Sequence, residues 1–135
     1  MAVDPDYVAH VLDLFSGLGP IRTGRMFSGV SLFVEDDVMF GMISSSQVVY
    51  LKSDDATRPA LENAGSVPFW YRRGSGEQQV TSLMSLPESA MDDPGEALDW
   101  ARQALPPARV AADKKRRDKA RKAARAIAKS AAQDS

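Results

Sequence analysis

The sequence predicts an α+β fold, a two-layer sandwich in which helices cover one antiparallel sheet. Residues 25–52 show the apolar alternation and the short apolar runs of three β-strands. Residues 67–73 and 79–86 have the same character on either side of a glycine-rich turn, which predicts a hairpin. Helical patterns before, between and after these segments complete the order α-β-β-β-α-β-β-α, for which two packed layers are the natural solution.

Periodicity and turn chemistry assign the three strands of residues 25–52. Residues 25–34 alternate between two partly apolar faces, residues 38–43 are almost continuously apolar, and residues 47–52 are rich in β-branched and aromatic side chains. The connections between them are Glu-Asp-Asp and Ser-Ser-Ser, which favour turns. A three-stranded antiparallel meander is therefore expected.

Capping residues and prolines place the first two helices. Asp4 and Pro5 suit the N-cap and the first position of a helix that ends before Gly17. Residues 53–55 precede a second helix that runs to about residue 64. Pro59 must then lie near the first turn of that helix, because a proline deeper in the helix would remove a hydrogen bond.

A third helix is expected to begin at Asp93 and to end at Pro106 and Pro107. Asp93 is the predicted N-cap, and Glu96 completes the spacing of a capping box. Two successive prolines lack the amide hydrogens that a helix needs, so they are predicted to close the globular part. The expected organisation is a globular domain of residues 1–105 and a tail of residues 106–135.

Composition excludes several classes of protein. A chain of 135 residues with 44% hydrophobic residues suits one domain with a single core. It has no cysteine, which excludes disulfides, thiolate nucleophiles, zinc ribbons and iron–sulfur clusters. The N-terminal residues are acidic where a secretory signal is basic, and no apolar run approaches the ~18 residues of a membrane span. We therefore expect a soluble, cytoplasmic protein.

Charge is distributed unevenly along the chain. Residues 1–105 hold 7 Lys/Arg and 15 Asp/Glu, whereas residues 106–135 hold 10 Lys/Arg and 3 Asp/Glu. An acidic body with a basic, alanine-rich tail is typical of a globular domain with an appended arm, expected here as an exposed, fraying helix or as a disordered segment. The candidate nucleic-acid-binding residues of the tail are Lys114, Lys115, Arg116, Arg117, Lys119, Arg121, Lys122, Arg125 and Lys129.

Such an arm can neutralise phosphates without contacting base edges. Two alternatives remain open for it: it could only improve solubility, or it could fold back on the acidic body. Insertion into a membrane surface is disfavoured, because alanine offers little apolar area.

We assign no catalytic residue and no metal ligand. The doublets Asp36-Asp37, Asp54-Asp55 and Asp92-Asp93 lie at predicted turns and helix starts, where aspartate satisfies backbone amides. His10, the one histidine of the sequence, has no nearby histidine or cysteine as a co-ligand and is expected to be a surface side chain. No enzymatic activity and no cofactor are therefore expected. The alternative is a small ligand-binding or metal-binding protein, or an enzyme, that uses an unrecognised acidic site.

Six short motifs follow one another between residues 25 and 87. They are Arg25-Met26-Phe27-Ser28-Gly29, Leu32-Phe33, Val38-Met39-Phe40, Tyr50-Leu51-Lys52, Gly65-Ser66-Val67-Pro68-Phe69 and Leu86-Pro87. In order and spacing they resemble the TfoX N-terminal domain family, the family of the Sxy competence regulators, over roughly residues 5–105. The longer regulators of that family carry a helical C-terminal domain, in whose place this chain has the basic tail.

The resemblance implies a small α+β fold similar to that of type III secretion chaperones, without a known cofactor or catalytic residue. It also implies an association with transcriptional regulation of DNA uptake. We interpret the positions that carry the resemblance as structural: Arg25, Met26, Phe27, Gly29, Phe33, Phe40, Tyr50, Leu51, Lys52, Pro68, Phe69 and Pro87.

Together these features predict a non-enzymatic regulatory or interaction domain with nonspecific nucleic-acid affinity in its tail. A second candidate surface surrounds Phe69, Trp70 and Tyr71. Aromatic residues in a strand belong by default to the core, but an exposed sheet face or edge could bind a protein partner or a second copy of the chain.

Overall fold

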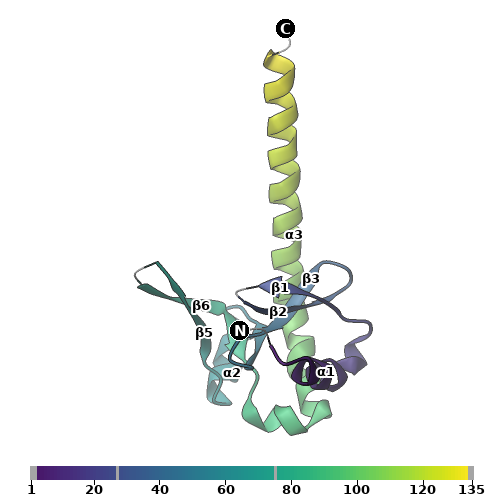
Figure 1. Cartoon of the computed structure of the whole chain (residues 1–135), viewed down its shortest axis with the longest axis vertical. Coiled ribbons are helices and arrows are strands. Elements are labelled where there is room, and N and C mark those ends of the chain that lie inside the picture. The colour runs from purple at the N-terminus through teal and green to yellow at the C-terminus, as the bar shows by residue number, and fades with distance from the viewer. Residues whose placement is uncertain (1–2, 27, 75, 134–135) are drawn as a thin grey trace.

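A computed structural model describes residues 3–26, 28–74 and 76–133, and it confirms the predicted α+β class (Figure 1). The helices are α1 (Pro5–Leu14), α2 (Arg58–Asn63) and α3 (Pro94–Gln133), with short 3₁₀ turns at Ser16–Leu18 and Glu88–Asp92. The strands are β1 (Arg22–Met26), β2 (Gly29–Val34), β3 (Val38–Ile43), β4 (Val49–Lys52), β5 (Pro68–Arg73) and β6 (Gly76–Ser85).

The six strands form one antiparallel sheet in the order β1-β2-β3-β4-β6-β5. The four strands before α2 follow one another as a meander, and the β5–β6 hairpin is added through pairing of β6 with β4. The distal part of this hairpin extends away from the rest of the molecule (Figure 1). Strands β1 and β5 are the two edges of the sheet.

The single strand predicted for residues 25–34 is wrong, because the structure divides this segment into β1 and β2. A turn at Ser28, whose φ is 62°, reverses the chain so that Met26 pairs with Gly29. A positive φ is uncommon for a residue other than glycine, and apolar alternation continues on both sides of the turn. The apolar alternation of residues 25–34 therefore gave no indication of the chain reversal at Ser28.

The predicted helix end at Pro106 and Pro107 is also wrong, since α3 continues through both prolines to Gln133. Their missing amides leave the carbonyl groups of Arg102 and Gln103 without their usual helical donors. Both residues are exposed, so water can solvate these carbonyls. Apolar packing continues on both sides of the prolines, with Ala104, Ala108 and Ala112 buried.

The main core lies between one face of the sheet and the helices α1 and α3. Phe15 from the end of α1 contacts Phe40 of β3 edge to face, with ring centroids 5.5 Å apart. Alanines of α3 complete this core at a spacing that keeps them on one helix face: Ala97, Ala101, Ala104, Ala108 and Ala112. Small side chains allow the helix to approach the sheet closely.

Two of the three helix starts lie where they were predicted. The side chain of Asp4 accepts a hydrogen bond from the backbone N–H of Asp6, and Pro5 is the first helical residue. Asp93 accepts from the backbone N–H of Glu96, but the Glu96 carboxylate accepts from Ser89 and Trp100 instead of completing a capping box. The second helix begins later than predicted, at Arg58.

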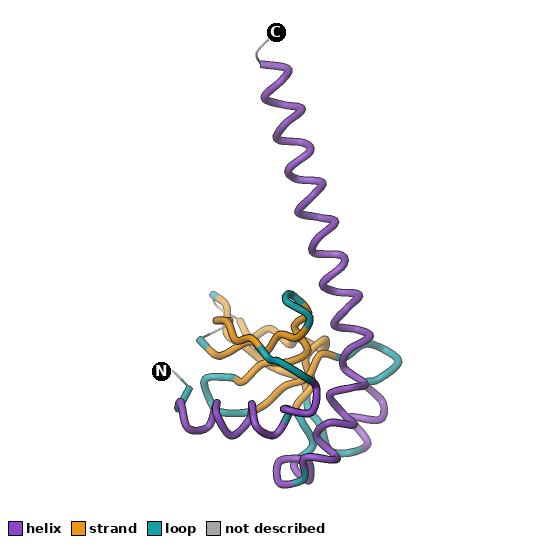
Figure 2. Tube along the Cα trace, turned by 90° about the vertical axis from the view of Figure 1, so that its right-hand side faces the viewer, coloured by secondary structure: helices purple, strands orange, loops and turns teal. Residues whose placement is uncertain are grey.

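The second half of α3 projects beyond the sheet (Figures 1 and 2). From residue 113 to residue 131 every side chain is exposed. At a rise of about 1.5 Å per residue, the projecting part is about 30 Å long. Of the tail expected as an exposed, fraying helix or a disordered segment, residues 113–131 form an exposed helix, whereas Pro107, Ala108 and Ala112 are buried.

Candidate nucleic-acid interface

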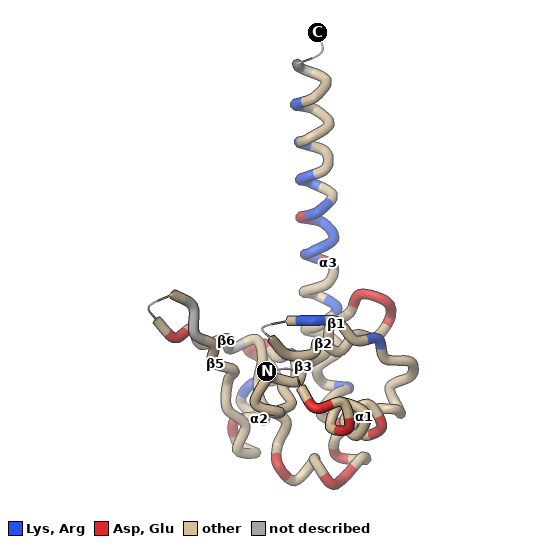
Figure 3. Tube along the Cα trace, in the orientation of Figure 1, with Lys and Arg blue, Asp and Glu red and all other residues tan. Residues whose placement is uncertain are grey.

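The basic residues predicted to bind nucleic acid all lie on the projecting part of α3. Figure 3 shows Lys and Arg along this part, while Asp and Glu concentrate on the body. All nine residues are exposed: Lys114, Lys115, Arg116, Arg117, Lys119, Arg121, Lys122, Arg125 and Lys129. One helix therefore presents them together.

Helical periodicity divides this part of α3 into two faces. Lys114, Arg121, Lys122, Arg125 and Lys129 follow the spacing i, i+7, i+8, i+11 and i+15, which places them on one face. The opposite face carries Ala120, Ala123, Ala124, Ile127 and Ala131 at i, i+3, i+4, i+7 and i+11. The result is a cationic ridge along one side of a helix whose other side is weakly apolar.

Acidic partners neutralise only part of this ridge among the described residues. Of the five ridge residues, Arg121 pairs with Asp118, and beside the ridge Arg117 pairs with Asp113, each about one helical turn away. Exposed pairs of this kind contribute about 0–1 kcal/mol and exchange readily with other anions. They leave the ridge strongly positive.

The turn between β2 and β3 attaches α3 to the sheet. Glu35 accepts two hydrogen bonds from Arg109, at 2.9 and 3.1 Å, and these bonds raise the pKa of the Arg109 guanidinium. Asp37 accepts from Nη1 of Arg116 with both carboxylate oxygens, at 2.7 Å. Glu35 and Asp36 adopt positive φ values of 49° and 68°, which shape this tight turn. The two pairs connect the first part of the projecting helix to the β2–β3 turn.

A hollow of about 410 Å³ lies between α3 and the strands beside this attachment. Its lining is Arg25, Met26, Ser31, Phe33, Asp37, Met39, Lys52, Ala108, Ala111, Ala112 and Lys115. A neighbouring hollow of about 290 Å³ shares Phe33, Asp37, Ala112 and Lys115 with it and adds Arg22, Arg116 and Lys119. We call the two together the α3 groove.

Lys52 is the most buried of the cations in the α3 groove. Burial, and secondarily the charge of Lys115, lower the pKa of its ammonium group below the usual value. No described carboxylate forms an ion pair with Lys52 or Lys115. The fold thus holds two positive charges near each other without an acidic partner for either.

Each of the predicted acidic doublets has at least one member whose side chain has a structural partner. Asp54 accepts hydrogen bonds from the backbone N–H groups of Ala56 and Thr57, and Asp55 pairs with Arg58. Asp37 and Asp93 make the contacts given above. Within the described ranges, no three His, Cys, Asp or Glu residues gather closely enough to hold a metal ion. His10 is exposed, as expected.

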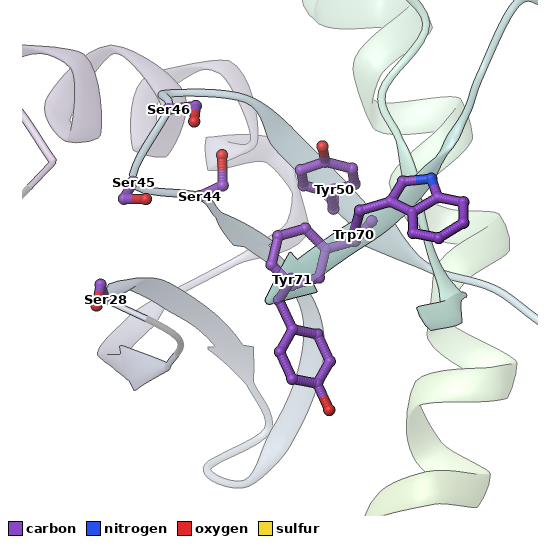
Figure 4. Close-up of a pocket in the computed structure, with 8 residues that line it drawn as sticks. Ser28, Ser44, Ser45, Ser46, Tyr50, Trp70 and Tyr71 are labelled. Atoms are coloured by element: carbon purple, nitrogen blue, oxygen red, sulfur yellow. The ribbon is translucent and has the colours of Figure 1, made fainter. Parts of the chain in front are cut away.

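The aromatic residues of β5 are divided between the interior and the surface. Phe69 is buried and contacts Tyr50 edge to face at 5.0 Å, whereas Trp70 is 52% exposed. They line a shallow hollow of about 400 Å³ together with Ser28, Ser44, Ser45, Ser46, Tyr50 and Tyr71. Figure 4 shows the Trp70 side chain directed away from the serines. Binding of a protein partner or of a second copy at this surface stays a prediction.

The positions that carry the family resemblance fall into two groups. Gly29, Phe40, Leu51, Phe69 and Pro87 are buried, and Tyr50 and Pro68 are partly buried, which agrees with a structural role. Arg25, Met26, Phe33 and Lys52, from four different motif positions, line the α3 groove instead. Phe27 lies outside the described residues. Sequence reasoning interpreted these four residues as structural and did not group them into a site, because they come together only through strand pairing and through the continuation of α3.

The fold and surface chemistry define a small α+β domain with a basic helical extension. The chain belongs to the TfoX N-terminal domain family, whose match covers residues 13–108. No curated protein matches the sequence. The cationic ridge lies beyond the matched residues, so the family match leaves its role open. In the described part of the chain, no helix has the length and apolar content needed to cross a membrane.

Proposed function

We propose that this protein is a non-enzymatic, competence-regulator-like domain that binds nucleic acid nonspecifically through the cationic ridge of α3. Its membership of the TfoX N-terminal domain family supports the regulatory part of the proposal. The observation that carries the binding part is the ridge itself, in which five cations follow one face of an exposed helix.

Phosphate neutralisation is the chemistry that this ridge favours. Lysine and arginine release the counterions condensed on a nucleic acid when they contact its phosphates. From Lys114 to Lys129 the ridge covers about 22 Å along the helix axis, enough to follow several successive phosphates. No aromatic side chain lies between the cations, so the ridge offers positive charge without a means of recognising bases.

The binding test is a titration of labelled duplex DNA and single-stranded RNA at several salt concentrations. The informative variant is Lys122→Gln, Arg125→Gln and Lys129→Gln in the full chain. We expect weaker binding to both nucleic acids and a reduction of the salt slope by about 0.9 for each lost contact with duplex DNA.

The opposite face of the same helix supplies a matched control. Ala120→Gln, Ala124→Gln and Ala131→Gln introduce three glutamines without removing a charge, and they should leave affinity and salt slope unchanged. Equal loss of affinity in both triple variants would contradict the proposal, because the effect would then come from helix stability instead of charge. Absence of binding by the unaltered chain would contradict it directly.

A further inference from the structure

The α3 groove has a chemical character different from that of the exposed ridge. The side chains of Met26, Phe33 and Met39 give its lining an apolar surface, and alanines of α3 extend this surface on the helix side. None of the five ridge residues lines either hollow of the groove. A ligand of this groove therefore has an apolar or aromatic part as well as a charge.

The charges around the groove are positive. Arg25, Lys52 and Lys115 surround the larger hollow, and Lys119 and Arg22 extend the positive charge along the smaller one. Among the described lining residues Asp37 supplies the one carboxylate, and Arg116 already binds both of its oxygens. A ligand that compensates Lys52 and Lys115 must bring its own negative charge.

The groove adjoins the cationic ridge. Lys115 and Lys119 line the groove, and they lie in the same exposed segment of α3 as the ridge, with Lys115 next to the ridge residue Lys114. Figure 3 shows basic segments of β1 beside this part of α3. A polyanion that follows the ridge toward the body therefore arrives at the groove.

We propose that the α3 groove takes up one unstacked nucleotide of a single-stranded nucleic acid, with its phosphate between Lys52, Lys115 and Arg25 and its base on Met26, Phe33 and Met39. This inference rests on the proposed binding of nucleic acid by the ridge. A volume of about 410 Å³ lies at the lower end of the range for small-ligand sites, which suits one nucleotide. Bases of a duplex stay stacked and paired, so only a single strand can place a base there.

The structure also offers a local reporter for this site. Met26 and Met39 line the groove, whereas Met91 lies in the Glu88–Asp92 turn and packs against the main core. In protein labelled at its methionine methyl groups, a short oligothymidylate should shift the NMR signals of Met26 and Met39 and leave that of Met91 in place. A duplex of the same length and inorganic polyphosphate should move neither groove signal, because neither supplies an unstacked base.

A binding comparison separates the groove from the ridge. Arg25→Gln with Lys52→Gln should weaken binding of oligothymidylate about tenfold and change duplex affinity less than twofold. Lys122→Gln, Arg125→Gln and Lys129→Gln should weaken binding of both. Methyl shifts in the unaltered protein test the same site independently of whether the groove variant folds.

Several outcomes would overturn the inference. If the groove variant binds oligothymidylate as tightly as the unaltered protein, the groove inference is overturned. The ridge proposal stands in that case if the ridge variant still loses affinity. An equal loss for single strand and duplex, or groove shifts caused by polyphosphate, would mean that the groove binds phosphate alone. Failure of the unaltered chain to bind any nucleic acid would overturn both proposals together.

Discussion

Lys52 is a lysine that folding removes from water without providing a carboxylate partner. Its pKa is lowered from 10.5, first by burial and then by the charge of Lys115. Between that lowered pKa and 10.5 the unfolded chain binds more protons than the folded chain, so the contribution of Lys52 to stability rises with pH across this interval. At neutral pH the charged Lys52 side chain therefore destabilises the fold.

Lys52→Met is therefore expected to stabilise the protein at neutral pH. The substitution keeps an unbranched side chain and removes the charge, so the variant should unfold at a higher temperature than the wild type near pH 7. The difference should shrink as the pH rises through the lowered pKa toward 10.5, because the folded wild-type protein loses the Lys52 proton in this interval. Burial also raises the pKa values of Tyr7 and Tyr50, but both tyrosines titrate in the wild type and in the variant, so their contributions to the stability difference cancel. A pH-independent difference would show that charge is not the cause.

The backbone of β3 leaves no room for a side chain at Gly29, since a Cβ at this position would overlap the carbonyl oxygen of Ile43. Gly29→Ala is therefore expected to lower the free energy of unfolding by about 1–3 kcal/mol, measured by urea denaturation. Gly76 is the matched control, because a Cβ there meets nothing within 4 Å and its φ is not positive. Gly76→Ala should change stability by less than about 0.5 kcal/mol. Equal effects at the two glycines would refute the steric explanation.

At the scale of secondary structure, local chemistry predicted two of the three helix starts and two of the three helix ends. Asp4 and Asp93 act as caps because their side chains satisfy amides within a few residues, which the sequence displays directly. The end of α3 depends on tertiary packing of Ala108 and Ala112, which no local pattern contains. The β1–β2 turn was missed for a related reason. Ser28 adopts a positive φ that pairing within the sheet requires, and serine is not a residue type that predicts a positive φ.

Pro106 provides the test of how α3 tolerates two prolines. Proline inside a helix costs up to about 3 kcal/mol relative to alanine, part of which is offset by the restriction it places on the unfolded chain. Because Pro106 is exposed, Pro106→Ala should restore a helical hydrogen bond without losing packing and should raise the free energy of unfolding by about 1–2 kcal/mol. Pro107 is buried, so Pro107→Ala should gain less. A loss of stability in Pro106→Ala would mean that this proline supports the fold.

At the scale of the whole molecule, the sequence predicted the charge of the site better than its shape. The cationic ridge depends on composition and helical spacing, so it was visible in residues 114–129 alone. The α3 groove combines β1, β2, β3, β4 and α3, and Lys52 and Lys115 are far apart in the chain. The groove forms because α3 continues past Pro107 and pairs with the β2–β3 turn, which places the alanines and Lys115 of α3 opposite the strands.

Truncation tests where the globular part of the molecule ends. A chain ending at Arg117 keeps Ala108, Ala112 and the pairs of Arg109 and Arg116 with the β2–β3 turn, so its thermal unfolding should match that of the full chain. A chain ending at Pro107 loses two buried alanines and both pairs, and should be less stable by at least about 1.5 kcal/mol.

The two truncated chains should both lose affinity for duplex DNA, because each lacks most of the cationic ridge. Only the chain ending at Arg117 keeps the α3 groove substantially intact, so a loss of binding in that chain can be assigned to the ridge without a loss of folding. Circular dichroism and thermal unfolding of both chains are the required measurements. Equal stability of the two would show that residues 108–117 contribute nothing to the fold, and the globular part would then end at the prolines after all.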